Sequence, residues 1–146
     1  MGTSHGSWKL NMKRILTLLF FMLAGMLQPV MAADEKPAED TYAYYGFEPE
    51  IVTNYISNRK KLGFVRISVE LMVKDPQDLV ALQHHDPLLR AAIVEILGNQ
   101  PEDRVKSLTG REEIRRECYD TVNRLLEQET GRALVVNLLF TKYLYD

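Results

Sequence analysis

The sequence predicts an α+β domain, in which two N-terminal strands (as a hairpin) and one C-terminal strand form a small sheet packed against two to three helices. Residues 64–74 alternate apolar and polar side chains, which is typical of a strand with one buried and one solvated face. Residues 86–98 and 108–131 repeat apolar side chains every three or four positions, as amphipathic helices do. Strands at both ends with helices between them favour a sheet covered by helices.

The N-terminal strand region covers residues 42–56, which are rich in tyrosine and β-branched side chains. Pro49 restricts this region to an edge, a strand start or a bulge, because proline has no N–H to donate to a ladder. Residues 58–61, Asn-Arg-Lys-Lys, form a basic turn that is expected to join it to the next strand as a hairpin. In that next strand the odd positions from 65 to 73 are all Val, Ile or Leu, and we assign them to the core.

The first long helix is expected to begin at Asp86. Asp86 is a good N-cap, Pro87 suits the first helical position, and Gly98 suits the residue after the helix. Residues 77–84 are then expected to form a separate short helix whose inward side chains are Leu79, Val80 and Leu82.

The second long helix has the pattern of a capping box at its start, with Thr109 and Glu112, and a glycine stop at Gly131. Its apolar stripe points to the sheet, and Arg115 is expected on the opposite, solvated face. The core is expected to join this stripe with the strand and the first helix, through Val65, Ile67, Val69, Leu71, Val73, Leu88, Leu89, Ile93, Ile96, Ile114, Val122 and Leu125.

The closing strand, residues 134–143, is apolar at both odd and even positions. A strand of that composition is often central in its sheet, or its second face meets a partner.

The first 32 residues are interpreted as an N-terminal extension and a secretory signal peptide. Lys13 and Arg14 precede thirteen uncharged residues, and small residues near Ala32 suit a peptidase site. The apolar run is shorter than the roughly 20 residues that a spanning helix needs. An uncleaved inner-membrane anchor is the alternative, and a start at Met12 would give a more compact leader. Residues 33–41 are then a flexible lead, and residues 42–146 the folded domain.

Composition narrows the class of function. Three of the 18 basic residues and none of the 20 acidic residues lie in the first 33 positions, so the remainder carries 15 basic and 20 acidic residues, a net charge of −5. That balance argues against nucleic-acid binding. Cys118 is the only cysteine, so no internal disulfide forms, and its place on an apolar stripe indicates a buried side chain.

Residue patterns that would indicate an enzyme are missing. His84, His85 and Asp86 are adjacent, whereas a zinc site needs three or four convergent ligands. The sequence contains no glycine-rich phosphate loop and no Ser-His-Asp set. We therefore expect a non-catalytic protein without a cofactor or metal, which acts through protein–protein interaction.

Several segments in a fixed order resemble the FliL family of flagellar basal-body-associated proteins. They are Val69-Glu70-Leu71-Met72-Val73, His85-Asp86-Pro87-Leu88-Leu89-Arg90, Ile93-Val94-Glu95-Ile96-Leu97, Leu108-Thr109-Gly110-Arg111-Glu112, Val122-Asn123 and Leu139-Phe140-Thr141-Lys142-Tyr143. A looser match is Phe47-Glu48-Pro49 followed by Asn54. The resemblance covers about two-thirds of the chain.

The resemblance implies a stomatin-like (SPFH) periplasmic domain that self-associates into oligomers or a ring. It also implies association with the flagellar motor and stator, with a role in motility and chemotaxis and no catalysis. Family members usually carry an uncleaved transmembrane helix and a longer linker, from which the cleavable leader predicted here departs. Location in the periplasm, with association with the inner membrane at the basal body, is the expectation. The alternative is a periplasmic module that binds a small apolar ligand and is unrelated to motility.

Candidate partner-binding residues are Tyr44, Tyr45, Lys60, Lys61 and Tyr143. Tyrosine suits an interface because it adds a large, rigid and amphipathic surface. The alternative role for the tyrosines is to cover the edge of the sheet.

Overall fold

Strand β3 (Gly63–Val73) is the centre of the sheet in the computed structural model, which describes residues 41–58 and 62–146. β4 (Val135–Tyr145) runs antiparallel along one side of β3. β1 (Ala43–Gly46) and β2 (Ile51–Tyr55) share its other side, one after the other. β2 and β3 are antiparallel, as the predicted hairpin requires. The predicted signal peptide lies outside the described residues, and so does the basic triplet of the hairpin turn.

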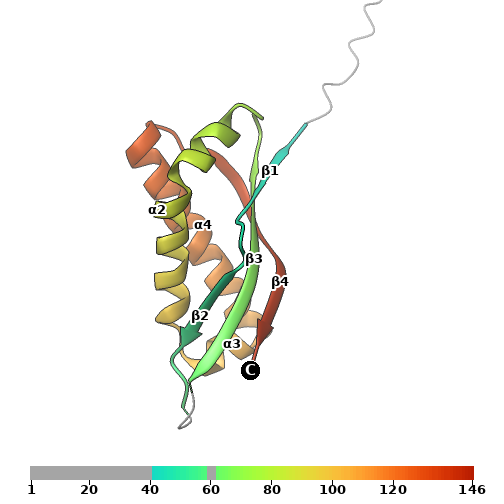
Figure 1. Ribbon diagram of the computed structural model, residues 1–146, viewed down its shortest axis with the longest axis vertical. Coiled ribbons are helices and arrows are strands. Elements are labelled where there is room, and N and C mark those ends of the chain that lie inside the picture. The colour runs from blue at the N-terminus through green and yellow to red at the C-terminus, as the bar shows by residue number, and fades with distance from the viewer. Residues whose placement is uncertain (1–40, 59–61) are drawn as a thin grey trace, which may run out of the picture. The chain divides into compact units, whose positions relative to one another are not determined.

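In the described part of the chain three helices pack with this sheet, so the predicted α+β fold is confirmed. α2 (Asp78–Gly98) and α4 (Leu108–Thr130) are long and lie side by side over one face, as Figure 1 shows. The short α3 (Glu102–Lys106) connects them at the end of the sheet where β4 finishes. The other face of the sheet carries no helix in the described part of the chain.

The alternation predicted for β3 is confirmed. Every odd-numbered side chain from Val65 to Val73 is buried against the helices, and the even-numbered ones are exposed or half-buried. Such a central strand fixes the sheet register, because a shift by one residue would move all five apolar side chains into water.

The predicted start of the first long helix at Asp86 is wrong. α2 begins at Asp78 and continues through Pro87, so the two helices expected at 77–84 and after Asp86 are one. Pro87 donates no N–H to the carbonyl of Gln83, but both residues are exposed, where water satisfies such a carbonyl. A continuous helix buries Leu82 and Leu89 in one row, and that burial offsets the cost of an internal proline.

The single helix also corrects the predicted core. Its fully buried row is Leu82, Leu89, Ile93 and Leu97. Val80 and Leu88, which were expected inside, are 72% and 38% exposed, because they lie off this row. Ile96 only packs against the edge of the core.

In α4 the buried row is Gly110, Ile114, Cys118, Val122 and Leu126, so Leu126 takes the fully buried place that was expected for Leu125. The predicted capping box is wrong, because the N-cap is Ser107, whose hydroxyl accepts the N–H of Gly110 at 3.0 Å. The predicted stop is confirmed, since Gly131 adopts the left-handed conformation with φ of 80°.

Two register shifts explain why β4 is apolar at odd and even positions. They fall opposite Ser68/Val69 and Met72/Val73, and each lets one residue of β4 slip out of the ladder. The core-facing residues are therefore Val135, Leu138 and Phe140, with Tyr143 half-buried beyond the shift opposite Ser68/Val69. β4 is an edge strand rather than a central one, because β3 is its only partner within residues 41–58 and 62–146.

Candidate functional site

Tyr44 and Tyr45 are adjacent in β1 and therefore lie on opposite faces of the sheet. Tyr44 is opposite Met72 on the helix-free face, and 53% of it is exposed. Tyr45 is half-buried on the helix side. Of this pair, Tyr44 is the residue that a partner can reach directly.

Tyr45 belongs to a polar cluster that fastens β1 to α2. Its hydroxyl donates to Asp86 at 2.8 Å, and Asp86 pairs with Arg90 at 3.4 Å. Arg90 donates to the carbonyl of Pro49 and stacks over the ring of Phe47. Burial, together with the Asp86 carboxylate, raises the pKa of Tyr45 to about 12. Asp86 therefore accepts a hydrogen bond from a strand and does not cap a helix.

Tyr143 fastens the far half of β4 to α3. Its hydroxyl donates to the carbonyl of Val105 at 3.0 Å, and the guanidinium of Arg111 lies 4.9 Å from the centre of its ring. Burial raises the pKa of Tyr143 to about 12. Because Tyr143 is opposite Ile67 in the sheet and Tyr44 is opposite Met72, the two tyrosines are not brought together. Lys60 and Lys61 lie outside the described residues.

The outer edge of β4 is covered by three side chains of α4. Asn123 donates to the carbonyl of Val135 at 2.8 Å and accepts its N–H at 3.0 Å. Arg115 donates to the carbonyl of Leu138 at 2.9 Å, and Arg111 to that of Phe140 at 3.3 Å. These bonds occupy backbone groups that an edge strand otherwise offers to another chain.

The position of Arg115 contradicts the predicted solvated face. Its guanidinium also forms two hydrogen bonds with Glu112, at 2.8 and 2.6 Å. Hydrogen bonds from Arg115 and then Arg116 lower the pKa of Glu112 to about 2. Arg115 therefore links α4 to β4 as a structural side chain.

We expect Arg115→Ala to destabilise the domain by about 1–3 kcal/mol, because it leaves the carbonyl of Leu138 without its donor. Arg116 is the matched control, since its side chain is 72% exposed and it also pairs with Glu112. Arg116→Ala should change the free energy of unfolding by less than about 0.5 kcal/mol. Urea melts of the two variants make the comparison, and equal effects would show that the β4 edge bond contributes nothing.

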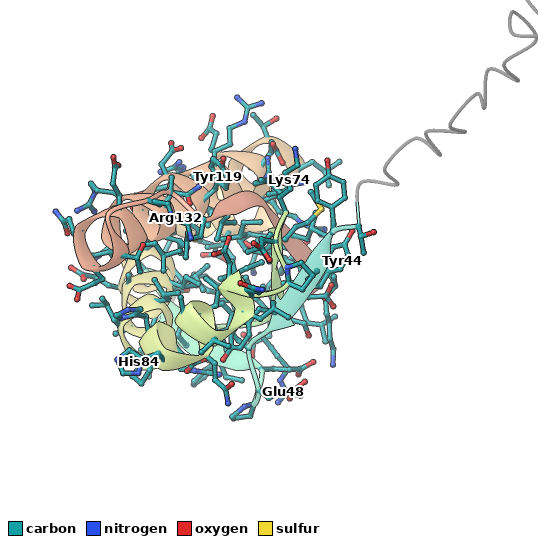
Figure 2. All side chains as sticks on the ribbon, turned by 90° about the horizontal axis from the view of Figure 1, so that it is seen from above. Tyr44, Glu48, Lys74, His84, Tyr119 and Arg132 are labelled. Carbon is teal, nitrogen blue, oxygen red and sulfur yellow. The ribbon has the colours of Figure 1, made fainter. Side chains whose placement is uncertain are left out.

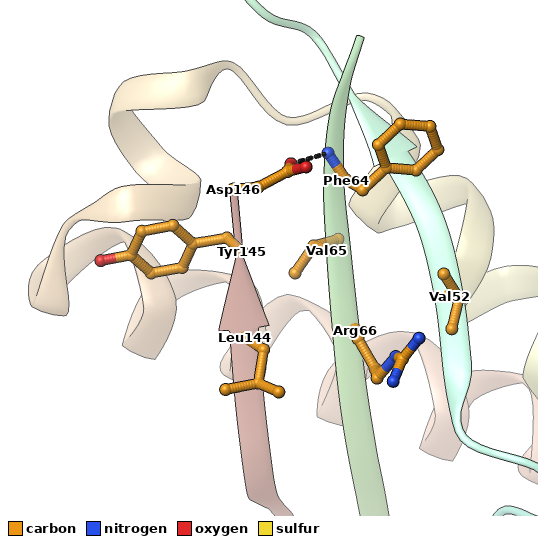
Figure 3. Close-up of a pocket in the computed structure, with 7 residues that line it drawn as sticks. All are labelled: Val52, Phe64, Val65, Arg66, Leu144, Tyr145 and Asp146. Carbon is orange, nitrogen blue, oxygen red and sulfur yellow. Dashed lines mark hydrogen bonds between the residues drawn. The ribbon is translucent and has the colours of Figure 1, made fainter.

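The helix-free face of the sheet has a shallow hollow of about 350 Å³ at the end of β4, shown in Figure 3. Three apolar side chains surround Arg66 of β3 there. They are Val52 of β2, Phe64 of β3 and Leu144 of β4. The Asp146 carboxylate accepts the N–H of Phe64 at 2.8 Å and closes one end of the hollow. Apolar side chains around one cation suit a peptide side chain better than a reaction centre.

The described residues offer little to redox or metal chemistry. No group of three or more His, Cys, Asp or Glu side chains is gathered there in a way that could hold a metal ion. Cys118 is buried, and burial raises the pKa of its thiol to about 12, which keeps it protonated and unreactive at neutral pH. No helix within the described ranges is long and apolar enough to cross a membrane.

Comparison with known proteins identifies the family. The family described as "Flagellar basal body-associated protein FliL" matches residues 44–145, which is nearly the whole described domain. The chain belongs to the FliL family. A curated relative, the "Flagellar protein FliL" of Aquifex aeolicus (strain VF5), is 27% identical over 99 residues, which are 68% of this chain. The chain spans 58% of the length of that relative.

The segments that carried the FliL resemblance hold this domain together. Asp86 and Arg90 fix β1 to α2, whereas Arg111 and Asn123 cover the edge of β4. These roles are not evident in the sequence, because a residue 12 or more positions away from its partner leaves no local pattern. The one signal in the sequence was that polar residues lie inside the family segments without a local pattern that explains them.

Proposed function

We propose that this FliL-family domain is a non-catalytic accessory protein of the flagellar basal body. It acts in the periplasm by contact with motor and stator proteins and supports motility by assembly. The observation that carries the proposal is the family match over residues 44–145, the same residues that form the sheet and its three helices. The name of the Aquifex relative also places that protein in the flagellum.

The features that support binding to another protein are exposed residues on the helix-free face of the sheet, and not a deep cleft. Tyr44 is exposed on the helix-free face, and the hollow around Arg66 lies on the same face. We propose that Lys60 and Lys61 add a basic contact in the hairpin turn, and that the domain self-associates into oligomers or a ring. Tyr45 and Tyr143 would then support this surface from the core side, where their hydroxyls are already bonded.

The small-ligand alternative, in which an apolar molecule binds between the helices and the sheet, is less favoured by the packing of the described residues. The layer between helices and sheet is filled by side chains of 0% exposure, among them Leu71, Ile93, Ile114 and Leu138. A small apolar ligand placed there would have to displace close-packed side chains.

Deletion of the gene should impair swimming or swarming while filaments remain, because the proposal concerns support of the motor and not filament export. Tracking of cells under viscous load, with electron microscopy of filaments, measures both. The deletion strain complemented with the unmodified gene is the control. Motility of the deletion strain equal to wild type under load would contradict the flagellar role.

The double variant Lys60→Glu with Lys61→Glu should reduce motility of the complemented strain and leave the thermal melt of the purified domain nearly unchanged. A charge reversal in a turn alters electrostatic contact with a partner more than the core. Arg124→Glu, on the exposed side of α4, is the matched charge control and should complement fully. A double variant that complements as well as Arg124→Glu would remove the turn from the contact surface.

Cell fractionation with N-terminal sequencing tests the predicted cleavage after Ala32.

A further inference from the structure

The two edges of the sheet differ in how their outward backbone groups are hydrogen-bonded. On β4 the outward carbonyls of Val135, Leu138 and Phe140 accept hydrogen bonds from side chains of α4, and the N–H of Val135 donates to Asn123. The N–H of Leu138 donates to the Asn137 side chain of β4 itself. On the opposite side, β1 is an edge strand as well, because among the described residues it pairs only with β3.

The outward backbone groups of β1 belong to Tyr44 and Gly46. The N–H of Phe47 donates to the carbonyl of Val69 at 3.1 Å, so Phe47 faces β3. Alternate residues of an antiparallel strand direct their N–H and C=O to the same side. Tyr45 therefore also faces β3, and Tyr44 and Gly46 face away from the sheet. Within residues 41–58 and 62–146 no hydrogen bond reaches these outward groups.

This open edge is accessible. Gly46 is exposed although it has no side chain, so its exposed surface is backbone. The Tyr44 ring is exposed beside it. Figure 2 shows Tyr44 and Lys74 on the same side of the molecule, at the end where the chain enters β1. Lys74 follows the residue of β3 that pairs with Ala43, and it is exposed with no ion pair among the described residues.

We propose that β1 pairs with an extended segment of another protein, which adds a strand to the sheet along Tyr44 and Gly46. Unpaired edge groups are a template for this kind of strand addition, in which backbone bonds give affinity and side chains give specificity. The positive charge of Lys74 favours a segment with an acidic residue near that end of β1. The Tyr44 ring would pack against alternate side chains of the added strand.

A second copy of this chain fits the edge less well. A sheet continuing from β1 of one copy to β4 of the next is blocked from Val135 to Phe140 by the side chains of α4. Pairing of β1 with β1 would join two strands of four residues, each about 13 Å long. So short a contact gives two folded copies far less than the roughly 1,200 Å² of a stable interface, whereas an extended segment can bind through a smaller contact, as transient partners do. An extended segment needs only the backbone groups that β1 offers.

The inference rests on the proposed function only for the origin of the partner, and peptide binding tests it independently. The probe is a phage-displayed library of random peptides of about ten residues, selected on the purified full chain, followed by synthesis of the most enriched peptide. We expect enriched sequences with alternating β-branched residues and at least one acidic residue. Hydrogen exchange at the amides of Tyr44 and Gly46 should slow on binding. Absence of enrichment, or protection elsewhere only, would overturn the proposal.

The variant Gly46→Pro removes an outward N–H, and a proline is tolerated at an edge strand when its nitrogen faces solvent. It should weaken binding of the selected peptide at least about tenfold. Gly46→Ala is the matched control and should bind normally. It keeps the N–H, and its Cβ would meet only the Glu70 side chain, at an ordinary 3.9 Å. Equal affinity of the two variants would contradict strand addition.

A second measurement keeps the test valid if Gly46→Pro fails to fold. Peptides N-methylated at alternate residues are compared on the unmodified protein: one alternate set should abolish binding and the other should leave it intact, because only one set faces β1. Loss of binding in both sets, or in neither, would overturn the proposal. Sedimentation measures the oligomeric state of the unmodified chain and of Gly46→Pro. If the unmodified chain is a dimer and the variant is a monomer, a second copy occupies the β1 edge, and the proposal of a strand from another protein is refuted.

Discussion

Replacing Gly110 with alanine is expected to destabilise the domain by about 3 kcal/mol, although alanine is the better helix former. A Cβ at Gly110 would lie 2.2 Å from the carbonyl oxygen of Arg104 and 2.6 Å from its Cα. Both atoms belong to the backbone of α3, which cannot move aside as a flexible side chain would. Separation of α3 from α4 would also disturb Val105, which is buried and accepts the Tyr143 hydroxyl.

Gly98→Ala is the control for this variant, because Gly98 is also a helical glycine, the last residue of α2, but a Cβ there has room. The nearest atom to its added Cβ would be the carbonyl oxygen of Asn54 at 3.8 Å, an ordinary contact. Gly98→Ala should therefore be neutral or stabilise by up to about 1 kcal/mol. Thermal and urea melts of the two variants measure the difference. A Gly110→Ala protein as stable as the parent would show that α3 does not pack against α4 as described.

Leu126→Ala should cost about 2–5 kcal/mol, because it removes a fully buried side chain and leaves a cavity between α4 and the sheet. Leu125 is the matched comparison, with the same side chain one position earlier. It only packs against the edge of the core, so Leu125→Ala should cost about 1–2 kcal/mol. Denaturant melts of the two variants, with unchanged m-values, give the loss in unfolding free energy for each. A larger effect at Leu125 would restore the apolar stripe expected from the sequence and refute the observed rotation of α4.

The family and the order of the elements could be predicted, because both depend on patterns of residues that are close together in the sequence. The alternation from Val65 to Val73 reports which face is buried, and it needs no knowledge of the partner. Helix start signals were less reliable. Asp86 and Thr109 both suit a helix start, yet the helices begin at Asp78 and Leu108. A cap contributes only about 1 kcal/mol, so in α2 the burial of Leu82 overrides it. In α4 the cap is Ser107 in place of Thr109, because its hydroxyl accepts the N–H of Gly110.

The candidate site was less predictable than the fold. Tyr44 and Tyr45 had equal claims in the sequence, and only the sheet showed that one is exposed and the other is bonded to Asp86. The closing strand looked ready for a neighbour on both faces. Its register shifts place Val135, Leu138 and Phe140 inward, and α4 covers its edge.

By itself the sequence determined the central strand, the two amphipathic helices and the FliL family, because periodicity and segment order are properties of neighbouring residues. Only the tertiary structure decided which edge of the sheet is closed. Asn123 and Arg115 reach β4 across 12 and 23 positions of the chain, while the outward groups of Tyr44 and Gly46 meet no described residue. Backbone hydrogen-bonding groups are identical at every residue, so their satisfaction depends on what the fold brings beside them.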